Sequence, residues 1–419
     1  MSALLKILVI KDIHKGMMRT AFSKKIGLQT GKTGVSLVFA LIFCAISACS
    51  NVHKSSVIEI VEIYEAIRGA SGKQNLSAFA KTVKYIPLET NEDCLIDRIR
   101  NLHLTSEYIL VATYGECYLF DRDNGKFVRK IGASGDGPNE YRGIRDVAID
   151  EKRGLIYILS NENLRLVCYK FDGEPVMHIT NFNNEFFQKF ELIAPETYIA
   201  YFPNPFGVET RRLVIGNFTD DQQTVIPNFS FFVQEQVPGR SFMLQINALA
   251  QFYHFNDQLH FKECLNDTIF TIDDFQLFPK YILNLQSLKF PNSLRGVGLR
   301  DFMQMQNRYV ICNLVNENST HLFISAEYDN KIYSIVFDKN TGITGVVDAI
   351  DKSEPLHFFG LQDDISIVKM PFWPRYVNPI GEMVAWYDAF DFIEYCEKNN
   401  LVALPNISEE DNPIIVIAK

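Results

Sequence analysis

The chain contains 419 residues, of which 41 are Lys or Arg and 50 are Asp or Glu, so its formal net charge is −9. Hydrophobic residues make up 47% of the chain, which is enough to bury a core and excludes a disordered or collagen-like polymer. Because the chain is acidic and has no Lys/Arg-rich run, we expect no nucleic acid partner. Its length fits either two or three ordinary domains or one large β domain, so the number of domains must be inferred from the order of the predicted helices and strands.

The first fifty residues have the pattern of a signal peptide. Basic residues precede the apolar run Val35–Ile46, whose 12 residues are too few to cross a bilayer as a helix, so a transmembrane anchor is the weaker alternative. The tetrapeptide Ile46–Cys49 resembles a bacterial lipobox, in which the cysteine is acylated and becomes the first residue of the mature chain. We therefore expect residues 1–48 to be a lipoprotein signal peptide. Lipidated Cys49 would then hold the protein on a membrane of the bacterial cell envelope, the outer membrane in preference to the inner one.

Residues 49–79 follow the lipobox and contain Ser, Lys and Gly around one short β-branched run, Val57–Ile63. We interpret this segment as a tether that leads into a strand.

From residue 80 onward, short segments rich in Val, Ile, Tyr and Phe alternate with Asp, Asn and Gly turns, which is typical of antiparallel strands. The pattern Phe-Asp-turn-Gly at Phe120 recurs at Phe171, 51 residues later, close to the ~40–50-residue period of propeller blades. The clearest four-stranded meander is predicted at Asp146–Asp150, Leu155–Leu159, Arg165–Phe171 and Pro175–Ile179. Three strands are predicted before it, at Tyr108–Thr113, Cys117–Asp121 and Lys126–Ile131, and further four-stranded units at 189–226, 247–285 and 307–347.

The C-terminal part is less regular. Ala389–Lys398 has the apolar spacing of a short amphipathic helix, and Asn412–Ala418 reads as a buried strand. A propeller closes its ring by pairing strands from both ends of the chain, and Lys81–Leu88 is the natural partner for the last strand.

A glycine loop at residues 132–141 resembles an NHL-type propeller repeat. More narrowly, the chain resembles the NHL/TolB-like six-bladed β-propeller lipoproteins common in Bacteroidetes, also in its Asn266–Phe270 strand start and its Asp411–Val416 ending. The resemblance covers residues 80–419 and implies an all-β domain, a six-bladed β-propeller of four-stranded antiparallel blades, with a short helix near the C-terminus. The loop residues that carry it are Gly132, Gly135, Gly137, Pro138, Glu140 and Tyr141.

We interpret this loop as structural. It lies where the chain crosses from the outer strand of one blade to the inner strand of the next, and glycines allow a tight path there. Tyr141 can then pack between blades while Glu140 caps backbone N–H groups.

No catalytic motif appears in the chain. The histidines are scattered, without the spacing of metal ligands, and no nucleophilic serine motif is present, so we assign no catalytic residue, no metal ligand and no cofactor. Ligands from different blades could still converge in the central channel. The resemblance therefore leaves open, as the alternative function, an NHL- or lactonase-like enzyme with a divalent metal there.

Two short segments supply the candidate ligand-binding residues. Trp373, Arg375 and Tyr376 lie on a proline-flanked loop that could form an aromatic platform for a sugar or peptide. The other segment lies where the chain enters a predicted inner strand and contains Arg142, Arg145 and Asp146. Because side chains alternate along a strand, only one of Arg145 and Asp146 can face the channel.

The sequence thus favours a membrane-tethered envelope lipoprotein whose propeller binds a ligand or partner without catalysing a reaction. A carbohydrate, a peptide or an envelope protein is the expected partner. A subunit of a larger envelope assembly is a third hypothesis.

Overall fold

The fold is that of a computed structural model, which describes residues 57–163, 165–179, 187–219, 222–235, 246, 249–353 and 358–419. The predicted signal peptide and the predicted lipidation site, Cys49, lie outside these residues. Within them, no helix combines the length and the apolar character that a bilayer span requires.

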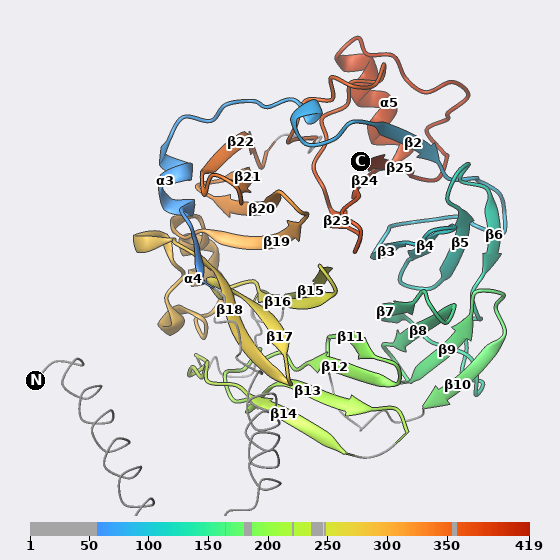
Figure 1. Ribbon diagram of the computed structural model, residues 1–419, viewed down its shortest axis with the longest axis horizontal. Coiled ribbons are helices and arrows are strands. Elements are labelled where there is room, and N and C mark those ends of the chain that lie inside the picture. The colour runs from blue at the N-terminus through green and yellow to red at the C-terminus, as the bar shows by residue number, and fades with distance from the viewer. Residues whose placement is uncertain are drawn as a thin grey trace, which may run out of the picture. The chain divides into compact units, whose positions relative to one another are not determined.

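Six four-stranded antiparallel sheets are arranged as the blades of a ring (Figure 1), which confirms the predicted six-bladed, all-β propeller. Blade 1 comprises β3 (Asn101–Leu104), β4 (Tyr108–Ala112), β5 (Cys117–Asp121) and β6 (Phe127–Lys130). Blade 2 comprises β7 (Ile144–Asp150), β8 (Leu155–Ser160), β9 (Leu166–Lys170) and β10 (Pro175–Ile179). Blade 3 comprises β11 (Lys189–Ala194), β12 (Thr197–Tyr201), β13 (Arg211–Asn217) and β14 (Gln223–Pro227).

The second half of the ring is built in the same way. Blade 4 comprises β15 (Ala250–Phe255), β16 (Gln258–Glu263), β17 (Thr268–Asp273) and β18 (Gln276–Leu283). Blade 5 comprises β19 (Ile311–Glu317), β20 (His321–Tyr328), β21 (Lys331–Asp338) and β22 (Thr344–Asp351). Blade 6 comprises β23 (Tyr376–Val377), β24 (Met383–Tyr387), β25 (Ile414–Ala418) and β2 (Val83–Pro87).

The middle strands of the blades carry the continuous apolar runs of the sequence. Ile109–Ala112 in β4 and Cys117–Phe120 in β5 are buried at every position, because neighbouring blades cover both faces of the sheet. The outer strand β10 is mostly exposed. Hydrophobic contact between blades therefore holds the ring together.

Ring closure joins the two ends of the described chain. Strand β25 lies between β24 and β2, and it pairs with β2 from Val83 opposite Ala418 to Pro87 opposite Ile414. This pairing confirms the closure predicted for Lys81–Leu88.

Helices are few. The predicted C-terminal helix is α5, with the expected bounds Ala389–Lys398, and the others are α3 (Ile63–Arg68), α4 (Leu299–Met305) and short 3₁₀ turns at Leu76–Ala78, Gln286–Leu288, Asn292–Leu294 and Gln306–Arg308. Strand β1 (Glu59–Val61) pairs in parallel with β18, and Val61 and Ile63 are fully buried. From residue 57, the segment interpreted as a tether is thus part of the folded domain: β1 packs on blade 4, α3 on blade 5, and Leu76 in the core shared by blades 5 and 6.

The glycine loop connects β6 of blade 1 to β7 of blade 2. Gly132 has a φ of +68°, and a Cβ atom there would lie 2.4 Å from the Tyr169 hydroxyl. The Gly137 N–H donates to the Glu140 carboxylate over 2.7 Å. Tyr141 is fully buried among side chains of both blades and donates its hydroxyl to the Ile131 carbonyl over 2.8 Å. These contacts give the loop a packing role.

Candidate functional site

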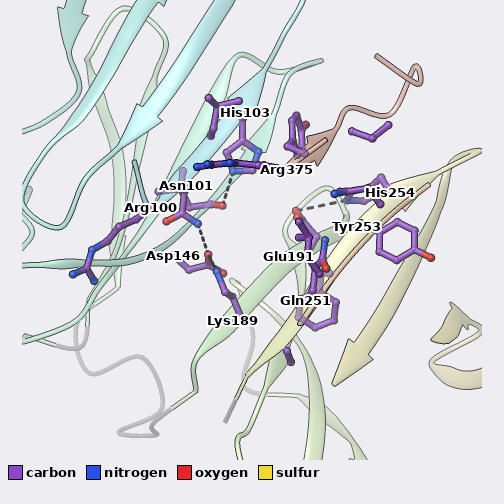
Figure 2. A pocket seen from close by; sticks show the side chains of 18 of the residues that line it. Arg100, Asn101, His103, Asp146, Lys189, Glu191, Gln251, Tyr253, His254 and Arg375 are labelled. Atoms are coloured by element: carbon purple, nitrogen blue, oxygen red, sulfur yellow. Dashed lines mark hydrogen bonds and ion pairs between the residues drawn. The ribbon is translucent and has the colours of Figure 1, made fainter. Parts of the chain in front are cut away.

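A cavity of about 300 Å³ lies in the central channel, where the innermost strands of all six blades meet (Figure 2). Alternate residues of an inner strand point toward the channel, so every blade contributes polar side chains to the cavity wall. The figure shows these side chains converging from several blades. Most of them connect one blade to the next.

Asp146 connects blades 1, 2 and 3. Its carboxylate accepts hydrogen bonds from the Asn101 amide and the Lys189 ammonium, both over 2.8 Å, and from the Phe190 N–H over 3.0 Å. The carboxylate is only 4% exposed, so these charge-assisted bonds compensate its burial. Asp146 is therefore a structural link as well as part of the cavity wall.

His103 adds a second contact between blades 1 and 2. Its Nε2 lies 3.0 Å from the Val147 carbonyl oxygen, and because a carbonyl can only accept, Nε2 carries the proton. Burial lowers the pKa of His103, so the ring is neutral and Nδ1 remains an acceptor.

Glu191 and His254 connect blades 3 and 4 across the channel, with 3.7 Å between Oε1 and Nε2. Burial alone would lower the pKa of His254 and raise that of Glu191. The attraction between the two groups outweighs burial, so the pKa of His254 is raised and that of Glu191 is lowered. The pair is a charged contact at mildly acidic pH.

The remaining junctions are closed by neutral groups. Between blades 4 and 5, Gln251 donates to the Val315 carbonyl over 2.7 Å and accepts from the Val315 N–H over 3.0 Å. Asn316 donates to the Pro374 carbonyl over 2.8 Å between blades 5 and 6. The Tyr376 ring meets the His103 ring edge-on, with centroids 6.0 Å apart, between blades 6 and 1. The six junctions together form what we call the channel belt.

Arg375 stands apart from the channel belt. It lines the cavity and lies over the Trp386 ring, with 5.0 Å between the guanidinium carbon and the ring centroid. Among the described residues, no carboxylate forms an ion pair with it. Protein surrounds the guanidinium closely enough to lower its pKa, although an arginine remains charged at physiological pH.

The candidate residues from the sequence divide into two groups. Asp146, Arg375 and Tyr376 line the cavity, whereas Arg142, Arg145 and Trp373 do not.

Each of the three residues outside the cavity has another role. Arg142 is half-exposed and pairs with Asp136 over 2.6 Å. Arg145, on the opposite side of β7 from Asp146, binds the Asn161 amide oxygen and the Phe187 carbonyl. Trp373 is 6% exposed and donates its indole N–H to Ser325 over 2.8 Å in the core between blades 5 and 6, so it forms no accessible platform.

Sequence reasoning missed most of the channel belt: Asn101, His103, Lys189, Glu191, Gln251, His254 and Asn316. These residues lie on the innermost strands, which are short and mix polar with apolar residues. A partial signal exists for two of the blades, because Lys189, Glu191, Gln251 and His254 lie near the start of the units predicted at 189–226 and 247–285.

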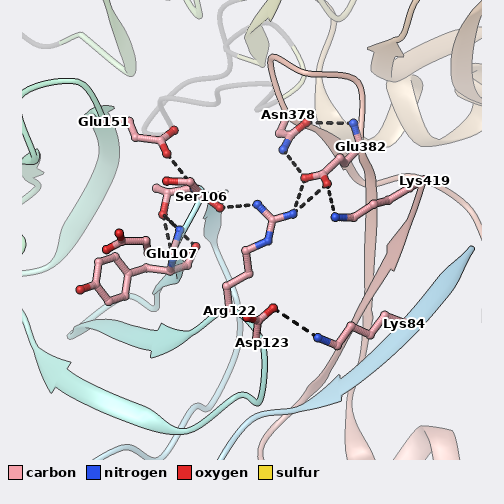
Figure 3. A network of polar contacts seen from close by, with 11 residues as sticks. Lys84, Ser106, Glu107, Arg122, Asp123, Glu151, Asn378, Glu382 and Lys419 are labelled. Atoms are coloured by element: carbon pink, nitrogen blue, oxygen red, sulfur yellow. Dashed lines mark hydrogen bonds and ion pairs between the residues drawn. The ribbon is translucent and has the colours of Figure 1, made fainter.

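Two of the buried carboxylates outside the cavity, Glu382 and Glu317, are paired with cations. Glu382 in blade 6 binds Arg122 of blade 1 and the C-terminal Lys419, both over 2.6 Å, and the Asn378 amide over 2.7 Å (Figure 3). Burial would raise the pKa of Glu382, but these cations outweigh it and the pKa is lowered. This cluster reinforces the junction at which the ring closes.

Glu317 lies between blades 4 and 5 and is 1% exposed. Its carboxylate contacts the ammonium groups of Lys280 at 2.9 Å and Lys339 at 2.7 Å, and it accepts from the hydroxyls of Tyr253 at 3.0 Å and Tyr281 at 2.8 Å. Burial would raise the pKa of Glu317, but the attraction of nearby cations, above all Lys280, outweighs it and the pKa is lowered. All of its strong contacts are therefore made as an anion.

No metal centre is identified. In the part of the chain that the structure describes, no three His, Cys, Asp or Glu side chains are grouped closely enough to hold a metal ion. The alternative of a lactonase-like metal enzyme gains no support from this arrangement.

The fold and the channel define the protein as a six-bladed β-propeller with a polar central cavity. The family described as "Domain of unknown function (DUF4934)" matches residues 58–419, so the chain belongs to this family. No curated protein matches the chain.

Two solved structures show the same fold. The protein BF0058 of Bacteroides fragilis NCTC 9343, whose name describes it as exported, is 14% identical, with a TM-score of 0.61 over 87% of this chain and 99% of that protein. A DUF4221 family member from Bacteroides vulgatus ATCC 8482 is 12% identical, with a TM-score of 0.50 over 81% of this chain and 96% of that protein. At these identities the similarity establishes the fold alone.

Proposed function

We propose that the protein is a membrane-tethered envelope lipoprotein whose propeller binds a ligand in its central cavity without catalysing a reaction. The observation that carries this proposal is the cavity of about 300 Å³ lined by all six blades. Small-molecule sites combine such a concave shape with a few polar groups that fix orientation. The acids and bases of the channel belt are engaged with one another, which favours recognition over proton transfer.

Binding in the cavity is tested by obstructing it. Asn313 lines the cavity from blade 5, is exposed, and among the described residues its side chain is hydrogen-bonded only to Glu327. We expect Asn313→Trp to fold and to lose the binding of monosaccharides and dipeptides that the wild-type protein shows by ligand-observed NMR. The control is Asn340→Trp on an exposed turn of blade 5. If no probe binds the wild type, or if Asn313→Trp binds equally well, the cavity is not the site.

Export and the lipid anchor are supported by the signal-peptide pattern, by the tetrapeptide Ile46–Cys49 and by the name of the similar B. fragilis protein. We expect Cys49→Ser to stop processing at this position and to release the protein from the membrane fraction, since acyl chains supply the attachment. Cell fractionation and the mass of the mature protein measure this, with Cys94→Ser as the control. A Cys49→Ser protein that is processed normally and remains membrane-bound would refute the anchor.

A further inference from the structure

The positively charged side chains that line the cavity differ in the protein groups that offset their charge. Lys189 is paired with Asp146 at 2.8 Å, and the guanidinium of Arg100 lies over the Tyr114 ring at 4.7 Å and, in Figure 2, away from the group around Arg375. Arg375 and Arg100 both line the cavity with a guanidinium for which the described residues supply neither an ion pair nor a hydrogen-bonded acceptor, and of the two it is Arg375 that lies beside His103 in Figure 2. The five N–H donors of Arg375 are thus available to a ligand.

The backbone of Arg375 is fixed by a strand contact, and its exposed side chain lies over an aromatic ring. Its backbone N–H donates to the Val384 carbonyl over 2.9 Å, which ties it to the start of β23, and one face of its guanidinium is covered by Trp386. A guanidinium held in one plane loses little freedom when it binds a planar anion through two parallel hydrogen bonds. A carboxylate carries the single negative charge and the planar geometry that match it.

Acceptors lie beside this donor. The Asn101 amide uses its N–H to bind Asp146, which leaves its carbonyl oxygen, and neutral His103 retains Nδ1 as an acceptor. Figure 2 shows Asn101, His103 and Arg375 at the same end of the cavity. A ligand that suits this end has an anionic group for Arg375 and hydroxyl donors for the two acceptors.

We propose that Arg375 binds the carboxylate of a small hydroxylated acid of sugar size, a uronic acid or a related hydroxy acid, in the central cavity. The cavity volume of about 300 Å³ is at the lower end of the range for ligand sites, which fits one such unit and not a long oligomer in full. The inference rests on the proposed function and adds the chemical class of the ligand.

Isothermal titration with D-galacturonate, D-glucuronate, D-galactose and galactose 6-sulfate tests the proposal on the wild type, Arg375→Gln and Arg142→Gln. Galacturonate and galactose form a matched pair that differs in the carboxylate. We expect an acid sugar to bind the wild type at least 10-fold more tightly than galactose, and Arg375→Gln to weaken it about 10–100-fold, as the loss of a charged hydrogen bond does. Arg142 lies outside the cavity, so Arg142→Gln should bind as the wild type does.

Arg375→Lys provides the second variant. It keeps the positive charge but loses the two parallel N–H donors of the guanidinium, so it should bind the acid with intermediate affinity. The proposal is overturned if neither acid binds, if galactose or the sulfate ester binds as tightly as the acids, or if Arg375→Gln retains wild-type affinity. Galactose binding that Asn313→Trp abolishes would overturn the acid assignment while leaving the proposed function intact. If none of the probes binds the wild-type protein, both the acid assignment and the proposed function are refuted.

Discussion

Replacing Glu317 with alanine is expected to destabilise the propeller by about 3–5 kcal/mol, the range for breaking a buried ion pair from one side. The substitution removes the only carboxylate that the structure places against both Lys280 and Lys339, so two ammonium groups would remain close together in a largely buried site. The hydroxyls of Tyr253 and Tyr281 would also lose their acceptor. Urea denaturation followed by fluorescence measures the change in the free energy of unfolding.

The matched control is Glu174→Ala. Glu174 also pairs with a lysine, Lys170, but both side chains are well exposed, so the expected loss is below about 1 kcal/mol. Glu317→Gln keeps the shape and one acceptor oxygen and should be less harmful than alanine. A loss below about 1 kcal/mol for Glu317→Ala would show that the two lysines find other compensation.

A chain that ends at Pro413 is expected not to fold. The deletion removes β25, in which Ile414, Ile415, Val416 and Ile417 are all at most 2% exposed. Burying one such side chain contributes about 1.5–3 kcal/mol, so the four together approach the whole stability of a typical domain, about 5–15 kcal/mol. Their side chains alternate between the core toward blade 5 and the core toward blade 1, so both junctions would open.

Loss of β25 would also leave β24 and β2 as unpaired edges, which promotes aggregation. Circular dichroism during heating and gel filtration measure both effects. A chain that lacks only Lys419 keeps β25 and should retain the cooperative transition at a somewhat lower temperature, because it loses the ion pair to Glu382 and the backbone hydrogen bonds of Lys419 with Lys81 and Thr82. A cooperative transition for the chain ending at Pro413 would mean that five blades are sufficient.

The sequence predicted the parts of the fold in which the physical signal is continuous. Middle strands such as Leu155–Ser160 are buried on both faces and show as unbroken apolar runs, and α5 has a full apolar stripe. It missed β3, since Asn101–Leu104 is short and alternates polar channel-facing residues with apolar ones. The pairing of β1 with β18 was not predicted, because an extra strand outside the four of a blade follows neither from the blade repeat nor from the closure of the ring.

Only some of the residues that line the cavity were predicted, because the inner strands lack a continuous apolar signal. Arg145 and Asp146 were candidates for the channel because they enter an inner strand, and alternation allowed only one of them without choosing which. Arg375 was a candidate ligand-binding residue through its proline-flanked loop. Trp373 shares that loop, yet it turns into the core because the Ser325 hydroxyl lies there to accept its indole N–H. Which residue of a loop faces a cavity depends on neighbours from another blade, and one chain read in order does not contain that information.

The channel belt has a consequence for how the ring is assembled. Each junction uses a different chemistry: an amide and a carboxylate, a carboxylate and an ammonium, a carboxylate and an imidazole, a glutamine that imitates a strand, an asparagine on a carbonyl, and two rings edge to edge. A blade moved to another position would face a partner that cannot complement it and would leave polar groups buried without hydrogen bonds. The order of the blades follows from the chain itself, and the unlike junctions of the belt add a penalty against rings that close with a blade missing or exchanged between two molecules.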